Sequence, residues 1–146
     1  MNVLFVCTGN TCRSPMAEAV FNHISVKKSG EHKAISRGTN VFFPQPINSK
    51  SVCALKEIGI DSGRHLSAQI TQDDIKSCDL VLTMSSSHKM ALKSAFPKYK
   101  DKIYTLSEKA YGREEDIEDP FGQSQEVYNS CLKSIYDAVD KILCMI

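Results

Sequence analysis

A cysteine and an arginine near the start of the chain have a spacing that could support phosphoryl transfer. Five residues separate Cys7 from Arg13, and Gly9 is among them. A thiolate is a strong nucleophile, and the planar guanidinium of an arginine binds two oxygens of a phosphoryl group at once. Because the chain has six cysteines and four arginines among 146 residues, this spacing would arise by chance in about one sequence in six. The surrounding residues must therefore decide whether the spacing has a function.

The segment around these two residues predicts a strand, a tight loop and a helix. Residues 2–7 are apolar, residues 8–14 are mostly polar, and residues 15–28 have helical character, with Pro15 at a position where its missing N–H costs nothing. Backbone N–H groups of such a loop can converge on an anion, and the helix N-terminus adds positive potential that also favours a thiolate. Ser14 could donate a hydrogen bond to that thiolate. The alternative is a buried strand-end cysteine followed by a surface arginine.

Strands and helices alternate along the rest of the chain. Further strands are expected at residues 34–36, 79–84 and 102–106. Helices are expected at 49–58, from Thr71, at 87–96 and from 123 or 124 onwards. The last helix has apolar residues at helical spacing, namely Val127, Cys131, Ile135, Ala138 and Ile142. This alternation predicts an α/β fold with a mostly parallel sheet, in which ligands bind at the carboxyl ends of the strands and thus at the loop 8–14.

An aspartate after the last predicted strand could act as a general acid. Breaking a P–O or P–N bond requires a proton on the leaving group, and the same group must later activate water. Asp119 precedes Pro120, which restricts the aspartate to an extended backbone on a loop. An ordinary Asp-Pro turn would have the same sequence. Glu118 and Asp116 are weaker candidates for the acid.

The composition predicts one domain over residues 1–146, long enough to form a core without disulfide or metal staples. The net charge is +1, from 18 Lys plus Arg against 17 Asp plus Glu, so no broad field favours nucleic acid or an anionic membrane. The first apolar run lacks a basic leader and a cleavage site, and no segment has the roughly 20 apolar residues that cross a bilayer. We therefore expect a monomeric cytoplasmic protein that binds neither nucleic acid nor membrane.

The six cysteines are irregularly spaced, at positions 7, 12, 53, 78, 131 and 144. There is no CxxC pair and no Cys/His cluster with zinc spacing, so we expect mostly reduced thiols, no metal site and no cofactor. Cys12 lies five residues from Cys7 on the same loop. Oxidation could join the two sulfurs and block the nucleophile reversibly, whereas the alternative for Cys12 is a small packing residue.

The segment VCTGNTCRSPMAEAVF resembles the signature of the low-molecular-weight protein tyrosine phosphatases. The resemblance continues through SRGT at 36–39, GRHLSAQIT at 63–71, DLVLTM at 79–84 and DPFG at 119–122. It covers nearly the whole chain in the same order. It implies a three-layer α/β fold, in which a four-stranded parallel twisted sheet has helices on both faces. It also implies a metal-independent protein phosphatase that acts on a phosphorylated protein through a cysteinyl-phosphate intermediate.

The resemblance also implies roles for residues of this chain. Cys7 would be the nucleophile, Arg13 the phosphoryl ligand and Asp119 the acid. The phosphate-binding loop would comprise Thr8, Gly9, Asn10, Thr11, Cys12 and Ser14. Hydrogen bonds from Ser36 and His65 would support this loop, and Phe121 would form a wall of the substrate site.

Three features of the expected pocket favour phosphoarginine over phosphotyrosine. Thr11 replaces an apolar residue, often Ile, that is usual in the family, and the loop CTGNTCRSP is similar to that of the protein arginine phosphatases. Only one aromatic residue, Phe121, follows Asp-Pro, where tyrosine-specific members commonly have two. The stretch MSSSHK lacks an acidic residue often found after Met in those members. Phe42 and Phe43 could still form an aromatic wall, so phosphotyrosine remains the alternative.

Two further classes compete with this interpretation. Thioredoxin-coupled arsenate reductases share the fold and the loop, but they need a pair of additional redox cysteines, one of them just after the third strand. Here Thr83, Met84 and Ser85 occupy that site, and Cys78 lies before the strand. A loop that binds phosphate without turnover would have lost its nucleophile or acid, and both are present.

Overall fold

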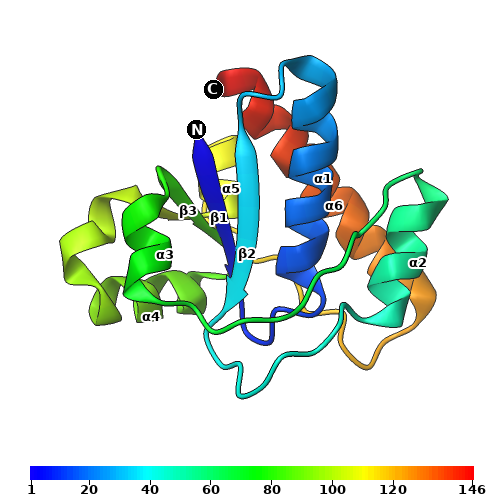
Figure 1. Cartoon of the computed structure of the whole chain (residues 1–146), viewed down its shortest axis with the longest axis horizontal. Coiled ribbons are helices and arrows are strands. Elements are labelled where there is room, and N and C mark those ends of the chain that lie inside the picture. The colour runs from blue at the N-terminus through cyan, green and yellow to red at the C-terminus, as the bar shows by residue number, and fades with distance from the viewer.

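The structure, a computed structural model, describes residues 1–146 and has a four-stranded sheet at its centre (Figure 1). The strands are β1 (Asn2–Cys7), β2 (Lys33–Gly38), β3 (Leu80–Thr83) and β4 (Ile103–Thr105). Their order is β2-β1-β3-β4, and all neighbouring strands are parallel. The carboxyl ends of all four strands therefore lie at one edge of the sheet, which confirms the expected topology.

Helices cover both faces of the sheet. One face packs against α1 (Arg13–Lys28), α2 (Ser49–Glu57), α5 (Leu106–Tyr111) and α6 (Gln125–Met145). The other face packs against α3 (Gln72–Ser77), α4 (Ser86–Ala95) and the 3₁₀ helix η1 (Pro97–Lys102). Figure 1 shows α3 and α4 on one side of β1 and β2, with α1 and α6 on the other. The three-layer α/β fold is as expected.

The central strand β1 contributes to both hydrophobic cores. Val3, Phe5 and Cys7 belong to the larger core under α1 and α6. Leu4 and Val6 belong to the smaller core under α3 and α4. Successive side chains of a strand point to opposite faces, so a strand buried on both faces is apolar at nearly every position. This double burial fixes the end of β1, and with it the position of Cys7.

Some element boundaries differ from the expected ones. Helix α1 begins at Arg13 rather than Pro15, so the tight loop is shorter than expected. The sequence does not predict helix α5, because its first residue, Leu106, continues the pattern of the preceding predicted strand. The sequence signal was present: Thr105 and Glu108 form a capping box, and Gly112 ends the helix with a left-handed backbone. Helix α5 therefore occupies residues 106–111, between β4 and the loop that carries Asp119.

The last helix, α6, buries one face against α1, α2 and α5. Four of the five apolar positions expected on this face are buried, but Val127 is 38% exposed. Tyr128 takes its place and is only 1% exposed. Val127 and Tyr128 both fit the helical spacing, because they lie four and three residues before Cys131. Packing against the neighbouring helices decides which of the two is buried. No helix of the structure is both long enough and apolar enough to span a membrane.

Candidate active site

The loop between β1 and α1 wraps around the sulfur of Cys7. Cys7 is the last residue of β1, and Arg13 is the first residue of α1. Asn10 turns the chain with a φ of 58°, a left-handed conformation that asparagine adopts more readily than most residues. Its backbone N–H donates to Cys7 Sγ over 3.3 Å. The expected tight loop therefore directs at least one main-chain donor at the sulfur.

A second donor reaches the sulfur from helix α1. Ser14 Oγ lies 2.9 Å from Cys7 Sγ, and both residues are buried. Asn10 Nδ2 donates to Ser14 Oγ over 2.8 Å. Because that bond occupies an acceptor site of the serine, the hydroxyl proton of Ser14 is free to point at the sulfur. Two hydrogen-bond donors therefore converge on the sulfur of Cys7.

The side chain of Asn10 ties the loop to two neighbouring segments. Its Nδ2 also donates to Ser36 Oγ over 2.9 Å, and its Oδ1 accepts from the N–H of Ala68 over 3.0 Å. The ring of His65 lies 2.7 Å from the Asn10 carbonyl through Nε2. Asn10 is fully buried, so each of these bonds forms in a region shielded from water. Ser36 and His65 thus both contact the loop at Asn10.

Gly38, at the end of β2, allows the neighbouring chain to lie against the loop. The N–H of Asn40 donates to the carbonyl of Thr8 over 3.0 Å. A Cβ atom at Gly38 would lie 2.5 Å from that same carbonyl oxygen and 2.5 Å from a methyl group of Val41. Any larger residue would therefore push the two segments apart. Gly38 lies in the Ser-Arg-Gly-Thr segment at 36–39, where only the structure shows why a glycine is needed.

Arg13 connects the loop to the segment that carries the expected acid. One of its terminal nitrogens, Nη1, donates to the carbonyl of Ile117 over 2.8 Å. The other, Nη2, lies 3.9 Å from Asp119 Oδ2. The arginine side chain is 7% exposed and the aspartate side chain 55% exposed. One guanidinium edge is thus fixed to the protein, while the ion pair with Asp119 lies at the open side of the site.

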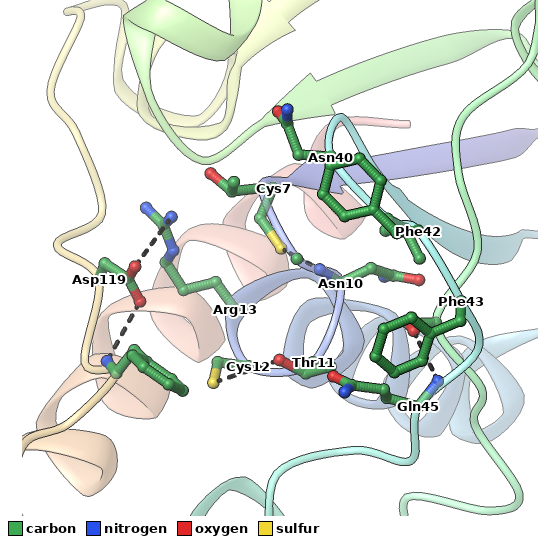
Figure 2. Close-up of a pocket in the computed structure, with 15 residues that line it drawn as sticks. Cys7, Asn10, Thr11, Cys12, Arg13, Asn40, Phe42, Phe43, Gln45 and Asp119 are labelled. Carbon is green, nitrogen blue, oxygen red and sulfur yellow. Dashed lines mark hydrogen bonds and ion pairs between the residues drawn. The ribbon is translucent and has the colours of Figure 1, made fainter.

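These groups line one open cavity of about 350 Å³ (Figure 2). The expected residues that line it are Cys7, Thr8, Gly9, Asn10, Thr11, Cys12, Arg13, Asp119 and Phe121. The others are Asn40, Val41, Phe42, Phe43, Gln45 and Ser67. Phe42 and Phe43 were considered for an aromatic wall, and they lie opposite Asp119 in Figure 2. Asn40 and Val41 follow β2, whereas Gln45 and Ser67 adjoin the β-bridge between Pro46 and Leu66.

A second cysteine of the cavity lining, Cys12, is buried. The hydroxyl of Tyr128 on α6 lies 3.5 Å from Cys12 Sγ. Burial raises the pKa of the Cys12 thiol, against an opposing effect of the hydrogen bond from Tyr128. Burial also raises the pKa of Cys131, on the same helix, to about 12. Cys12 and Cys131 are therefore thiols rather than thiolates at neutral pH.

His88, on α4, contacts the loop from the opposite face of the sheet. Its Nε2 lies 2.8 Å from Thr8 Oγ1. Burial and the nearby Arg13 charge lower the pKa of this imidazole to about 4, so the ring is neutral at pH 7. The sequence analysis assigned no role to His88. A lone histidine on a helix has no pattern that would show it reaching a loop 80 residues away.

The cysteine before the third strand lies at the wrong edge of the sheet for a redox relay. Cys78 ends α3 and precedes β3. Cys7 ends β1, which runs parallel to β3, so the two residues lie at opposite edges. Thr83, Met84 and Ser85 occupy the position after β3. This geometry agrees with the argument from sequence against an arsenate reductase.

Comparisons with known proteins agree with the fold. Curated relatives include the protein-arginine-phosphatase of Bacillus subtilis, which is 38% identical over 98% of this chain and 92% of its own length. The low molecular weight protein-tyrosine-phosphatase PtpB of Staphylococcus epidermidis is 36% identical over 97% of this chain and 96% of its own length. The chain is therefore similar to both arginine and tyrosine phosphatases over its full extent.

Solved structures give the same result. The YwlE arginine phosphatase, in a mutant with a phosphorylated active-site serine, superposes with a TM-score of 0.95 at 36% identity, covering 99% of this chain and 95% of that one. A low molecular weight protein tyrosine phosphatase from T. tengcongensis has a TM-score of 0.96 at 44% identity and covers 100% of this chain and 99% of its own. The model of the low molecular weight phosphotyrosine protein phosphatase family matches residues 2–146. The chain belongs to that family.

Proposed function

We propose that this chain is a metal-independent protein phosphatase that removes phosphoryl groups from arginine side chains through a cysteinyl-phosphate intermediate. The convergence of Cys7, Arg13 and Asp119 on one cavity carries this proposal. A nucleophile, an anion ligand and an acid are the three groups that phosphoryl transfer with a poor leaving group needs. All three come from segments that the fold fixes, namely the end of β1, the start of α1 and the loop before α6.

The first step forms a bond from Cys7 Sγ to phosphorus and breaks the bond from phosphorus to the leaving nitrogen. The hydrogen bonds from Asn10 and Ser14 hold the thiolate in place for this attack. Arg13, whose Nη1 is fixed on the Ile117 carbonyl, retains donors for the phosphoryl oxygens. As the P–N bond breaks, Asp119 gives its proton to the departing guanidino nitrogen. The phosphoryl charge is then balanced by the loop and the arginine.

The second step returns the enzyme to its starting state. Asp119, now a carboxylate, takes a proton from a water molecule that attacks phosphorus opposite the sulfur. The S–P bond breaks, the Cys7 thiolate leaves, and inorganic phosphate is released. The phosphoserine in the solved YwlE arginine phosphatase mutant supports this route, because a side chain in the active site of that relative accepts a phosphoryl group.

Thr11 supports phosphoarginine as the substrate. It lines the cavity and, in Figure 2, lies on the side of Phe43 and Gln45. A hydroxyl at this position can orient a polar guanidinium, and it adds less apolar bulk than the branched residue common in the family. The relatives from Bacillus subtilis and Geobacillus stearothermophilus are both protein-arginine-phosphatases. These observations favour arginine over tyrosine.

Phosphotyrosine is the second candidate, and the aromatic lining of the cavity favours it. Phe42 is 89% exposed and Phe43 is 63% exposed, yet both line the cavity, as does Phe121 from the acid loop. A phenyl ring of phosphotyrosine could pack between these side chains and gain apolar contact. The relatives named as PtpB tyrosine phosphatases are nearly as similar to this chain. A comparison of the two substrates therefore tests the proposal.

The substitution Thr11→Ile tests which substrate the loop prefers. We expect kcat/KM to fall for a phosphoarginine peptide and to stay equal or rise for a phosphotyrosine peptide of the same sequence. The relative change should be about 1 to 3 kcal/mol, the range typical of one pocket contact. Both rates are measured on one preparation of each variant by release of inorganic phosphate.

Two matched variants separate the hydroxyl from the bulk at Thr11. Thr11→Val removes the hydroxyl with little change of shape, and Thr11→Ser keeps the hydroxyl and removes the methyl group. If the hydroxyl orients the guanidinium, Thr11→Val reduces phosphoarginine turnover and Thr11→Ser retains it. A wild-type protein that prefers phosphotyrosine, with a substrate ratio that Thr11→Ile leaves unchanged, would assign the chain to the tyrosine phosphatases.

Mild peroxide should inactivate the enzyme reversibly if Cys12 protects Cys7. Peroxide converts the Cys7 thiolate to a sulfenic acid, and the Cys12 thiolate then displaces hydroxide to form a disulfide. Because burial raises the pKa of Cys12, the thiolate population and the rate of this closure should rise with pH. Mass spectrometry should detect the Cys7–Cys12 disulfide, and a thiol reductant should restore activity. Irreversible loss in both wild type and Cys12→Ser would leave Cys12 as a packing residue.

A further inference from the structure

His88 is a buried polar residue that the proposed reaction does not use. It lies in the first turn of α4 and is 7% exposed. Its ring makes two short contacts, from Nε2 to Thr8 Oγ1 at 2.8 Å and from Nδ1 to Ser85 Oγ at 2.7 Å. It does not line the cavity, whereas Thr8 does. His88 is therefore placed to act on the site only through Thr8.

The two contacts of the ring must differ in direction. The lowered pKa of His88, caused first by burial and then by the charge of Arg13, keeps the imidazole neutral at pH 7. A neutral imidazole has one N–H donor and one nitrogen lone pair. Either Nε2–H donates to Thr8 while Nδ1 accepts from Ser85, or Nδ1–H donates to Ser85 while Nε2 accepts from Thr8.

Ser85 is compatible with both arrangements. Its hydroxyl oxygen accepts from the backbone N–H of His88 over 3.3 Å, which caps α4. It also lies 2.9 Å from the hydroxyl of Ser87, which is exposed and can donate or accept. Ser85 can thus give its proton to Nδ1 and accept from Ser87, or the reverse. The choice between the two forms of His88 is therefore made at Thr8.

Thr8 has one hydroxyl proton, and the form of His88 decides where it points. Thr8 is exposed in the cavity wall, directly after Cys7. If Nε2 accepts, the threonine proton is used on the ring, and Thr8 has only lone pairs for the cavity. If Nε2–H donates, the proton is free for a bound group. A phosphoryl group bound on the loop is anionic, so a donor at this position is favourable and a lone pair is repulsive.

We propose that His88 is a positioning residue whose Nε2–H donates to Thr8 Oγ1, which turns the Thr8 hydroxyl into a donor for the bound phosphoryl group. The proposal deepens the proposed function, because it rests on phosphate binding by this loop. The hydroxyl of Thr8 then adds a side-chain donor to the backbone donors of the loop. Arg13 binds the phosphoryl group from the opposite end of the loop.

A matched pair of substitutions at His88 tests the proposal. In His88→Gln the side-chain Nε2 can still donate to Thr8, whereas the amide of His88→Asn is shorter and reaches only toward Ser85. The affinity for inorganic phosphate is measured by calorimetry on wild type, both variants, Thr8→Val and the double variant. We expect Thr8→Val and His88→Asn each to weaken phosphate binding about tenfold, as for loss of one hydrogen bond to a charged group, and His88→Gln to retain most of it.

The double variant distinguishes positioning from folding. If His88 acts only through Thr8, Thr8→Val together with His88→Asn binds phosphate no more weakly than Thr8→Val alone. The proposal is wrong if the losses of phosphate affinity in the two single variants add up in the double variant. It is also wrong if His88→Gln and His88→Asn lose equal affinity while Thr8→Val loses none. In either case His88 has a structural role. Thermal unfolding of every variant is measured alongside, so that a loss of fold is recognised by its Tm.

A spectroscopic measurement tests the tautomer directly. Two-bond nitrogen–proton correlations of the histidine rings in wild type with inorganic phosphate should show His88 protonated at Nε2, with His88→Gln identifying its signals among the four histidines. Protonation at Nδ1 in the phosphate complex would overturn the proposal. A protein that binds phosphate in this way but hydrolyses no phosphoarginine or phosphotyrosine would refute the proposed function and leave the role of His88 standing.

Discussion

Replacement of the proposed nucleophile, Cys7→Ser, should reduce turnover of phosphoarginine and phosphotyrosine peptides by roughly 10³-fold or more, on the scale seen when a catalytic nucleophile is removed from other enzymes. The serine hydroxyl remains protonated at neutral pH, so it is a far weaker nucleophile than a thiolate held by Asn10 and Ser14. If it does accept a phosphoryl group, an alkoxide is a poor leaving group for the second step. Inorganic phosphate binding should stay measurable, since the loop and Arg13 are unchanged.

The control for this variant is Cys53→Ser, because Cys53 is an exposed free thiol on α2 and does not line the cavity. Its activity should equal that of the wild type. Intact mass spectrometry of Cys7→Ser after incubation with substrate shows whether a phosphoryl group accumulates on the protein. Activity of Cys7→Ser within tenfold of wild type would exclude Cys7 as the nucleophile and the mechanism with it.

Removal of the proposed acid, Asp119→Ala, should slow hydrolysis of substrates with poor leaving groups by roughly 10²-fold or more. Aryl phosphates with strongly acidic phenols should lose far less, because their leaving groups depart without a proton. Asp119 lies at the cavity with one oxygen accepting from the N–H of Phe121 over 3.1 Å and the other 3.9 Å from Arg13. The measurement is kcat for a series of aryl phosphates of different leaving-group pKa, together with a phosphoarginine peptide.

Glu118→Ala is the matched control for the acid. Glu118 is the preceding residue of the same loop, is exposed, and forms no ion pair in the structure. Asp116 is unsuitable as a control because its carboxylate caps α4 through the N–H of Ser86 over 2.9 Å. Glu118→Ala should retain activity on every substrate. If Asp119→Ala lowers kcat by the same factor for every aryl phosphate of the series, Asp119 is not the acid.

Local sequence was sufficient to predict the core of the site. Cys7 and Arg13 lie within one strand-loop-helix segment, so their separation in space is fixed by seven residues of chain rather than by distant contacts. Asn10 is the one non-glycine residue with a positive φ, and its type agrees with that conformation. The alternation of strands and helices predicted a parallel sheet, and such a sheet places every strand's carboxyl end at one edge. These inferences needed only short-range chemistry and topology.

Other elements were missed although the sequence contained their signal. Helix α5 has a capping box between Thr105 and Glu108 and ends at Gly112, but it follows a strand of only three residues. In a segment of three residues, the apolar pattern of a strand cannot be told from that of the first turn of a helix. Val127 and Tyr128 show the same difficulty on α6, since adjacent positions differ by about 100° around the axis, and only packing against the neighbouring helices decides which one is buried.

Only the tertiary structure decided how distant segments complete the site. The Ile117 carbonyl that fixes Arg13, the N–H of Asn40 on the Thr8 carbonyl and the ring of His88 on the Thr8 hydroxyl come from segments that are 104, 32 and 80 residues away in sequence. The first two bonds use backbone groups, which any residue supplies, and the third depends on where the packing of α4 places a lone histidine, so no motif could predict them. The sequence alone predicted the strand, the loop and the helix start that bring Cys7 and Arg13 together. The packing of three layers determined what orients that loop, because parallel crossovers bring the ends of separate strands together regardless of their distance along the chain.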